Sequence, residues 1–201
     1  MNILTANSMI SYIKSAFALI LMLCASFIHA QMDISQSMTP TQYVNNVLLG
    51  EGVTATNVQF SGSLEQIGYL TQGVGFAIEN GIIMSTDLAT NPATCDMGAG
   101  CGTCGGAGDA DLLTVANSVP PLIGQTFSVS SVNDVCILEF DFQPSGDFVS
   151  FNYVFGSDEY LTYVNSAYND IFAFFLSGPG ISGPYASPAG FPDGAINIAE
   201  V

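Results

Sequence analysis

The pattern of apolar and polar positions predicts one helix near the start of the chain and strands after it. Residues 39–49 have helical periodicity, because apolar side chains recur on one face. The apolar positions of this face are Tyr43, Val44, Val47 and Leu48. The helix begins with Thr39 as the N-cap, Pro40 at its first position and Gln42 completing a capping box. Gly50 ends it. We therefore expect one short amphipathic helix.

After Gly50 the period of the pattern changes to two, which is typical of half-buried strands. Residues 138–142 alternate Leu and Phe with Glu and Asp, and a second alternating run follows at residues 149–155. A Pro-Ser-Gly turn at residues 144–146 separates the two runs. This arrangement predicts a β-hairpin.

Three further segments are predicted strands, at residues 53–60, 81–85 and 171–176. The last segment is apolar on both faces, which favours a central position in a sheet. Several short strands separated by Gly and Pro turns predict a mainly β fold. We expect a β-sandwich of the jelly-roll type with a single short N-terminal helix.

The N-terminus has the pattern of a secretory signal peptide over residues 1–30. Lys14 precedes an apolar run that is shorter than the roughly 20 residues of a membrane-spanning helix. We expect cleavage between Ala30 and Gln31. Lipidation of Cys24 and an uncleaved N-terminal anchor are the alternatives.

Residues 31–38 are predicted to lead into a single domain at residues 39–201, without repeats or linkers. Residues 195–201 have the pattern of another strand, and a domain does not normally end on an unpaired strand. We therefore expect the domain to be truncated, with its C-terminal part missing from this sequence.

The distribution of charge excludes several classes of function. The chain has 17 acidic residues, one Lys and one His, and both Lys14 and His29 lie in the predicted signal peptide. Nucleic-acid binding is excluded, because it depends on Lys and Arg. Catalysis by a His-dependent triad or a Schiff-base lysine, and zinc binding by imidazole, are excluded because the exported part has no His or Lys. Any buried carboxylate of the exported domain must therefore accept hydrogen bonds from neutral donors, bind a cation or stay protonated.

Four cysteines remain in the exported part of the chain: Cys95, Cys101, Cys104 and Cys136. An even number in an oxidising compartment predicts two disulfides, and the sequence leaves the three possible connectivities open. The disulfides would hold the glycine-rich loop at residues 98–108. A four-thiolate zinc site and a redox pair also suit the spacing of Cys101 and Cys104, but export favours disulfides.

The densest group of polar side chains follows the second alternating run. Asp158 and Glu159 lie there, and Asn169 and Asp170 come about ten residues later. Adjacent carboxylates without a basic neighbour repel each other, and Ca²⁺ bound by their oxygens would offset that repulsion. These four residues are candidate calcium ligands. The sequence favours a solvated turn instead, in which Asp and Asn cap backbone N–H groups, because loop Asp and Asn commonly serve turns.

Asp109 and Asp111 form a second candidate for a cation site. Two of the carboxylates could instead serve as the acid and base of a glycoside hydrolase. That reaction requires a particular separation in space, which a sequence does not supply.

Four stretches of the sequence together carry a family resemblance: TPTQYVNNVLLGEGVTATNVQFSGS (39–63), GIIMSTD (81–87), GDADL (108–112) and FNYVFGSDEYLTYVNSAYNDIFAFFLSGPGI (151–181). They resemble the choice-of-anchor L domain family. The resemblance implies a β-rich secreted or cell-surface module, typically of Bacteroidota, in proteins whose C-terminal anchoring or sorting segments vary. It implies no catalytic activity. Members of the family continue beyond the segment that resembles residues 197–199, which again implies a missing C-terminal part.

These observations together predict an exported, non-enzymatic module for adhesion or interaction, in the extracellular space or on the outer cell surface, with Ca²⁺ as a candidate stabilising ion. Its partner would be an extracellular protein or a glycan. Contact with a membrane would require the missing C-terminal anchor or sorting segment. The alternatives are a carboxylate-dependent hydrolase of extracellular polysaccharide and a structural building block of a larger surface protein.

Overall fold

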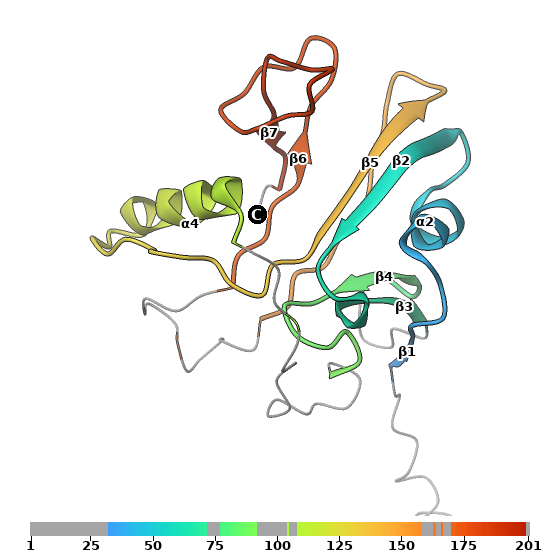
Figure 1. The fold of residues 1–201 in the computed structure, drawn as a ribbon, viewed down its shortest axis with the longest axis horizontal. Coiled ribbons are helices and arrows are strands. Elements are labelled where there is room, and N and C mark those ends of the chain that lie inside the picture. Colours follow the sequence, from blue (N-terminus) through green and yellow to red (C-terminus); the bar gives the residue numbers. More distant parts are fainter. Residues whose placement is uncertain are drawn as a thin grey trace, which may run out of the picture. The chain divides into compact units, whose positions relative to one another are not determined.

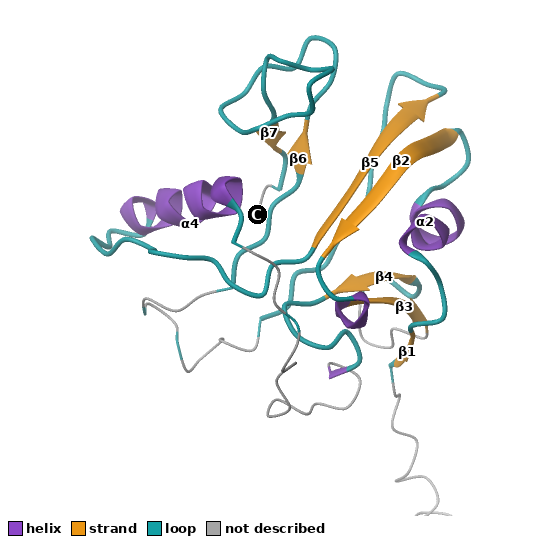
Figure 2. Ribbon diagram, in the orientation of Figure 1, coloured by secondary structure: helices purple, strands orange, loops and turns teal. Residues whose placement is uncertain are grey.

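A computed structural model describes residues 32–71, 77–91, 104, 108–157, 163, 166 and 170–199 of the chain (Figure 1). Within these residues the chain forms three small antiparallel sheets (Figure 2). The strands are β1 (Asp33–Ser35), β2 (Val53–Ser61), β3 (Ile67–Thr71), β4 (Gly81–Met84), β5 (Ile137–Pro144), β6 (Phe175–Leu176) and β7 (Ile196–Asn197). The helical segments are α2 (Pro40–Tyr43), η1 (Val44–Leu48), η2 (Leu64–Gln66) and α4 (Ala110–Leu122).

The predicted N-terminal helix is present and begins with the predicted capping box. The Thr39 side chain accepts a hydrogen bond from the Gln42 N–H at 3.3 Å, and the Thr39 N–H donates to Gln42 Oε1 at 2.8 Å. The α-helical turn α2 continues as the π-helical segment η1. Tyr43 and Val44 at the junction are buried, so this helix contributes to the core.

The three-stranded sheet has the order β1-β3-β4. Its central strand β3 is the most buried of the three, and Ile67 and Leu70 belong to the core. β4 confirms the strand predicted at residues 81–85. The pattern did not predict β3, nor β1 within residues 31–38.

The second sheet is the antiparallel pair β2 and β5, whose register runs from Val53 opposite Pro144 to Ser61 opposite Ile137. A bulge interrupts the register between Thr56 and Gln59. Asn57 lies in this bulge with a positive φ of 54°, and its side chain donates to Asp141 Oδ2 at 2.6 Å. Asn tolerates the left-handed conformation better than most residues, which explains its place here.

The predicted hairpin between residues 138–142 and 149–155 is wrong. The first run is β5, but its partner is β2, which lies far away in sequence. The described residues 147–157 form no strand. An alternating pattern indicates which side chains share a face, but it does not identify the strand that supplies the hydrogen bonds.

The third sheet pairs β6 with β7, with Phe175 opposite Asn197. β7 agrees with the strand pattern predicted from residue 195 onward. The strand predicted at residues 171–176 is confirmed only over its last two residues. Just before β6, the Phe174 N–H donates to Asn197 Oδ1 at 3.1 Å, and the Ile198 N–H donates to the Phe174 carbonyl at 2.8 Å.

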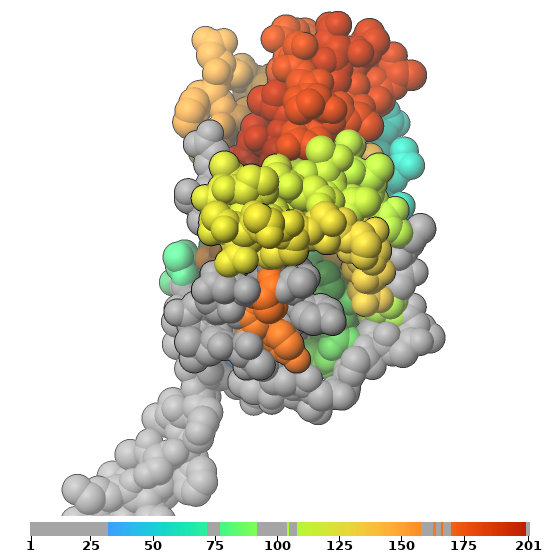
Figure 3. Space-filling view, turned by 90° about the vertical axis from the view of Figure 1, so that its left-hand side faces the viewer, coloured from blue at the N-terminus to red at the C-terminus, as the bar shows by residue number. Residues whose placement is uncertain are grey.

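The helix α4 corrects the prediction of a single short helix. Asp109 is its N-cap and accepts a hydrogen bond from the Leu112 N–H at 2.7 Å. Pro120 and Pro121 lie in its last turn, and a proline pair normally argues against a helix because it removes backbone donors. In Figure 3, α4 and the chain after it (yellow-green to yellow) adjoin the red C-terminal residues.

The mainly β class is therefore confirmed in the form of small antiparallel sheets, while a sandwich stays a prediction. None of the helices in the described ranges is long and apolar enough to cross a membrane.

Candidate interaction surface

The predicted calcium ligands lie mostly outside the described residues. Asp158, Glu159 and Asn169 belong to that part of the chain. Asp170 is described, and its Oδ2 accepts a hydrogen bond from the Ser157 hydroxyl at 2.6 Å. The described residues contain no group of three or more potential metal-ligating His, Cys, Asp or Glu side chains. Calcium binding by this cluster stays a prediction.

The second candidate pair, Asp109 and Asp111, makes contacts with the backbone. Asp109 caps α4, as described above. Asp111 Oδ2 accepts a hydrogen bond from the Ala186 N–H at 2.9 Å and so ties the first turn of α4 to the loop between β6 and β7. Both carboxylates therefore have a structural role that needs no cation.

Other carboxylates also receive hydrogen bonds from neutral side chains. Asp87 Oδ2 accepts from the Asn91 amide at 2.5 Å, in the same way that Asp141 accepts from Asn57. The absence of basic side chains from residues 31–201 makes such neutral donors the available partners.

Cys136 is a free thiol in the structure, in contrast to its predicted place in a disulfide. It directly precedes β5 and donates a hydrogen bond to the Ser85 carbonyl at 3.3 Å. Burial raises the pKa of this thiol to about 11. With Cys136 free, only one of the two predicted disulfides can form among the other three cysteines. Cys104 is buried, and Cys95 and Cys101 lie outside the described residues, so that single disulfide stays a prediction.

A buried amide fixes the chain just before β5. Gln66 is 0% exposed, its Oε1 accepts from the Ser63 N–H at 2.8 Å, and its Nε2 donates to the Asp134 carbonyl at 2.9 Å. Gly62 has no room for a side chain here, because a Cβ would lie 2.8 Å from Gln66 Oε1 and 3.1 Å from Cys136 Cβ. Gln66 thus completes the capping box of η2 and connects it to a distant loop.

Five aromatic rings pack between residues 151–155 and the chain before β6. The Phe151 and Phe174 ring centroids are 4.4 Å apart, and the Phe155 and Phe172 rings stack at 5.7 Å. Tyr153 lies between them, 5.3 Å from Phe172 and 5.4 Å from Phe174. We call these five residues the ring cluster. It brings the second alternating run, at residues 149–155, together with the apolar segment at residues 171–176, a contact that the sequence pattern did not predict.

The same segment exposes large apolar side chains to solvent. We call this set the apolar strip, which consists of Phe148, Val149, Phe151, Val154 and Phe155. Phe148 is 83% exposed, and Phe155 remains 51% exposed although its ring stacks on Phe172. Single exposed apolar residues are ordinary, but a contiguous set often marks an interaction site.

The backbone of the apolar strip is also open. Residues 148–152 and 154–156 form no backbone hydrogen bond with any other residue that the structure describes. Extended segments with unpaired N–H and C=O groups can accept a further strand. The sequence indicated the alternation of this segment, but it contained no signal that the backbone at residues 148–152 and 154–156 would lack a partner among the described residues.

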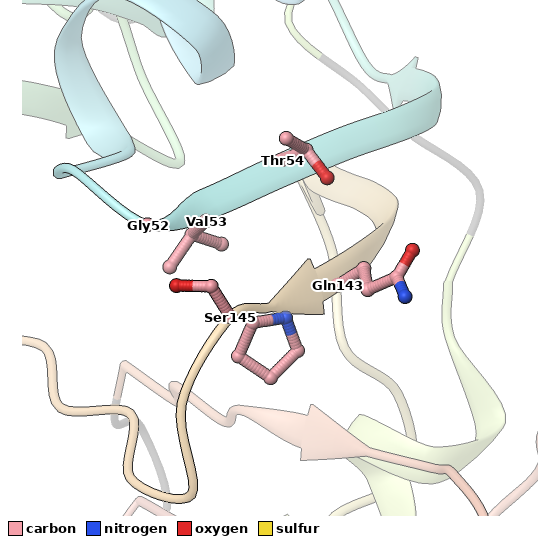
Figure 4. A pocket seen from close by; sticks show the side chains of 6 residues that line it. Gly52, Val53, Thr54, Gln143 and Ser145 are labelled. Carbon is pink, nitrogen blue, oxygen red and sulfur yellow. The ribbon is translucent and has the colours of Figure 1, made fainter.

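A shallow depression of about 280 Å³ lies at the end of the β2–β5 pair (Figure 4). It is lined by Gly52, Val53, Thr54, Gln143, Pro144 and Ser145. The Ser145 N–H donates to the Gly52 carbonyl at 2.7 Å, so the two chain segments close the end of the pair. The lining residues that the structure describes carry hydroxyls and an amide, and none of them is an acid, a base or a thiol.

These features define a mainly β domain with an open apolar surface. The chain belongs to the choice-of-anchor L domain family, because the family model matches residues 31–201. Neither the curated proteins nor the solved structures contain a match to the chain. Family membership confirms the resemblance in the sequence and indicates a surface-associated or secreted module of a non-catalytic kind.

Proposed function

We propose that the chain is a secreted or surface-displayed adhesion module that binds an extracellular protein, and that the apolar strip is its binding face. The observation that carries this proposal is the exposure of five large apolar side chains within eight consecutive residues. Such a set is costly to leave in water, and a partner that covers it gains free energy from its burial.

The ring cluster supports the proposal because it restrains one side of the strip. Phe151 and Phe155 use part of their rings to contact Phe174 and Phe172, and the rest of each ring remains exposed. Aromatic side chains that are already ordered lose little conformational entropy on binding. Anchors of this kind are typical of the central part of protein interfaces.

The chemistry of the strip favours a protein over a glycan. Its side chains are Phe and Val, which offer no hydrogen bonds to sugar hydroxyls, and the chain contains no Trp.

An array of immobilised extracellular-matrix proteins and glycans tests this preference. We expect binding to protein spots that is lost in Phe148→Ser and retained in Leu122→Ser, since Leu122 is equally exposed at 82% but lies in α4. Binding that is confined to glycans, or that does not depend on Phe148, contradicts the proposal.

The hydrolase alternative has its own test. Incubation of the chain with a panel of extracellular polysaccharides should release no reducing sugar. Turnover that disappears in Asp158→Asn or Glu159→Gln would replace the binding module with a carboxylate-dependent enzyme.

Stabilisation by calcium is a separate part of the proposal and rests on Asp158, Glu159, Asn169 and Asp170. A bound cation that prefers the folded state raises the midpoint of thermal unfolding. We expect EGTA to lower that midpoint and excess Ca²⁺ to restore it. An unchanged midpoint rules out a structural calcium site of useful affinity and leaves the proposed binding face unaffected.

A further inference from the structure

We propose that the segment bound by the apolar strip is extended, basic and apolar, and that it adds to residues 148–156 as a β-strand. This inference rests on the proposed function, since it names the partner of the same face. Strand addition combines main-chain hydrogen bonds with contacts between alternate side chains, and the strip offers both components. Its backbone is open at residues 148–152 and 154–156, and its apolar side chains are exposed.

The extended form of the partner follows from the ring contacts of the segment, because the alternate residues Phe151, Tyr153 and Phe155 all contact Phe172 or Phe174. In an extended chain, alternate side chains point to opposite faces. Val149, Phe151 and Phe155 then share the face of the ring cluster, while Phe148 and Val154 lie on the other face with Ser150 and Asn152 between them. A partner strand beside this segment needs apolar side chains toward the ring cluster. On the other face it needs long basic side chains, whose methylene groups pack on Phe148 and Val154 while their charged ends stay in water.

The basic character of the partner follows from charge. Residues 31–201 contain all 17 acidic side chains of the protein and no Lys, Arg or His. Asp147 directly precedes the strip, and the adjoining strand β5 contributes Glu139 and Asp141. A cationic segment is attracted to such a surface and associates faster with it, whereas an anionic segment is repelled.

The same charge argues against a second copy of the chain as the occupant. Two identical copies would bring together two surfaces that lack basic side chains, and their repulsion opposes association at low ionic strength. A basic segment of another protein has no such penalty. The charge of the chain therefore selects among partners that the apolar strip alone would accept.

Three soluble peptides of about ten residues test the inference, since this length covers one strand. They alternate Val with Lys, Val with Glu, and Ser with Lys, and each is titrated calorimetrically into the chain at about 50 mM salt. We expect the Val–Lys peptide to bind at least about tenfold more tightly than the other two. We expect Phe148→Ser to weaken this binding roughly tenfold and Leu122→Ser to leave it unchanged.

A fourth peptide, Val–Lys with N-methyl groups along one backbone edge, separates strand addition from apolar contact alone. We expect it to bind much more weakly, because it lacks the donors of the main-chain pairing. Equal binding of the two Val–Lys peptides would falsify strand addition.

The remaining outcomes separate the inference from the proposed function. If Val–Glu binds as well as Val–Lys, the partner is not basic, but the apolar binding face stands. If Ser–Lys binds equally well, charge alone is responsible and both statements fail. If none of the peptides binds, the inference is overturned. A dimer of the chain that dissociates on Phe148→Ser, as measured by sedimentation, also overturns it. In both cases the protein array tests the proposed function independently.

Discussion

β5 and the apolar strip have the same alternating pattern and yet differ in their environment. β5 lies opposite β2 over a long antiparallel register, and its backbone groups are used in that pairing. The strip follows it after a short turn, but its contacts with the described part of the chain are made through aromatic rings, without a ladder of backbone hydrogen bonds. Side-chain packing and main-chain pairing are thus separate requirements, and one segment can meet the first without the second.

This difference has a consequence for function. A strand that has both kinds of contact has few groups free for a partner, whereas the strip keeps its backbone groups and part of each apolar side chain exposed. This difference assigns β5 to the scaffold and supports the strip as the proposed binding face.

The largest effect on stability should follow from loss of the buried Gln66 amide, which connects η2 to the chain just before β5. Gln66→Ala leaves the Ser63 N–H and the Asp134 carbonyl without their partner in a buried site, and we expect a loss of about 3 kcal/mol in the free energy of unfolding. Urea denaturation measures this loss. The exposed Gln59 provides the control, since Gln59→Ala should change stability by less than about 0.5 kcal/mol. Equal effects of the two variants would mean that Gln66 does not hold β5 in place.

The ring cluster should contribute somewhat less than Gln66 to the free energy of unfolding. Phe174 contacts the rings of Phe151, Tyr153 and Phe172, and it is only partly buried. We expect Phe174→Ala to cost about 2 kcal/mol, below the range for a fully buried Phe. Since the cluster restrains the strip, the same variant should also weaken peptide binding in the titration. A variant that loses stability but binds normally would show that the strip needs no restraint.

The thiol at the start of β5 gives the scaffold a dependence on alkaline pH. Burial raises the pKa of Cys136 from 9.0 to about 11, so folding favours the neutral thiol. This contribution is complete below about pH 9 and is lost as pH rises toward 11, with a total of about 2 kcal/mol. We expect the stability difference between the parent chain and Cys136→Ala to decrease by this amount over that range. A difference that stays constant with pH would indicate a thiol that does not titrate, for example one held in a disulfide.

The smallest effect on stability should come from the strip itself. Phe148 is 83% exposed and has no ring contact among the described aromatic pairs, so Phe148→Ser should change the free energy of unfolding by less than about 0.5 kcal/mol. The same substitution should weaken binding roughly tenfold. Circular dichroism during thermal unfolding measures the change in stability, with Leu122→Ser as the matched control. A large loss of stability would assign Phe148 to the scaffold instead.

Local signals in the sequence predicted the parts of the fold that depend on neighbouring residues. The capping box of Thr39 and Gln42 is one case, and the alternation in β2 and β5 is another. Both patterns involve contacts within a few residues, which side-chain type and spacing determine directly.

Pairing over long distances could not be predicted in the same way. The choice of β2 rather than residues 149–155 as the partner of β5 depends on many weak contacts across the chain. Helix α4 was not predicted, because its two prolines argue against a helix. The role of Gln66 was not predicted either, because it depends on a carbonyl in a distant loop. Of the candidate site residues, Asp109 and Asp111 bind backbone groups, and the carboxylates near residue 158 retain their predicted role as a proposal.

Amide hydrogen exchange of the free chain shows directly whether the backbone of the strip is open, because it reports on main-chain pairing residue by residue. We predict that the amides of Phe148, Val149, Phe151 and Val154 exchange almost as fast as those of an unfolded peptide, while amides within β5 are protected. The Val–Lys peptide should then slow exchange in the strip. Protection of the strip in the free chain, at the level of β5, would contradict the account.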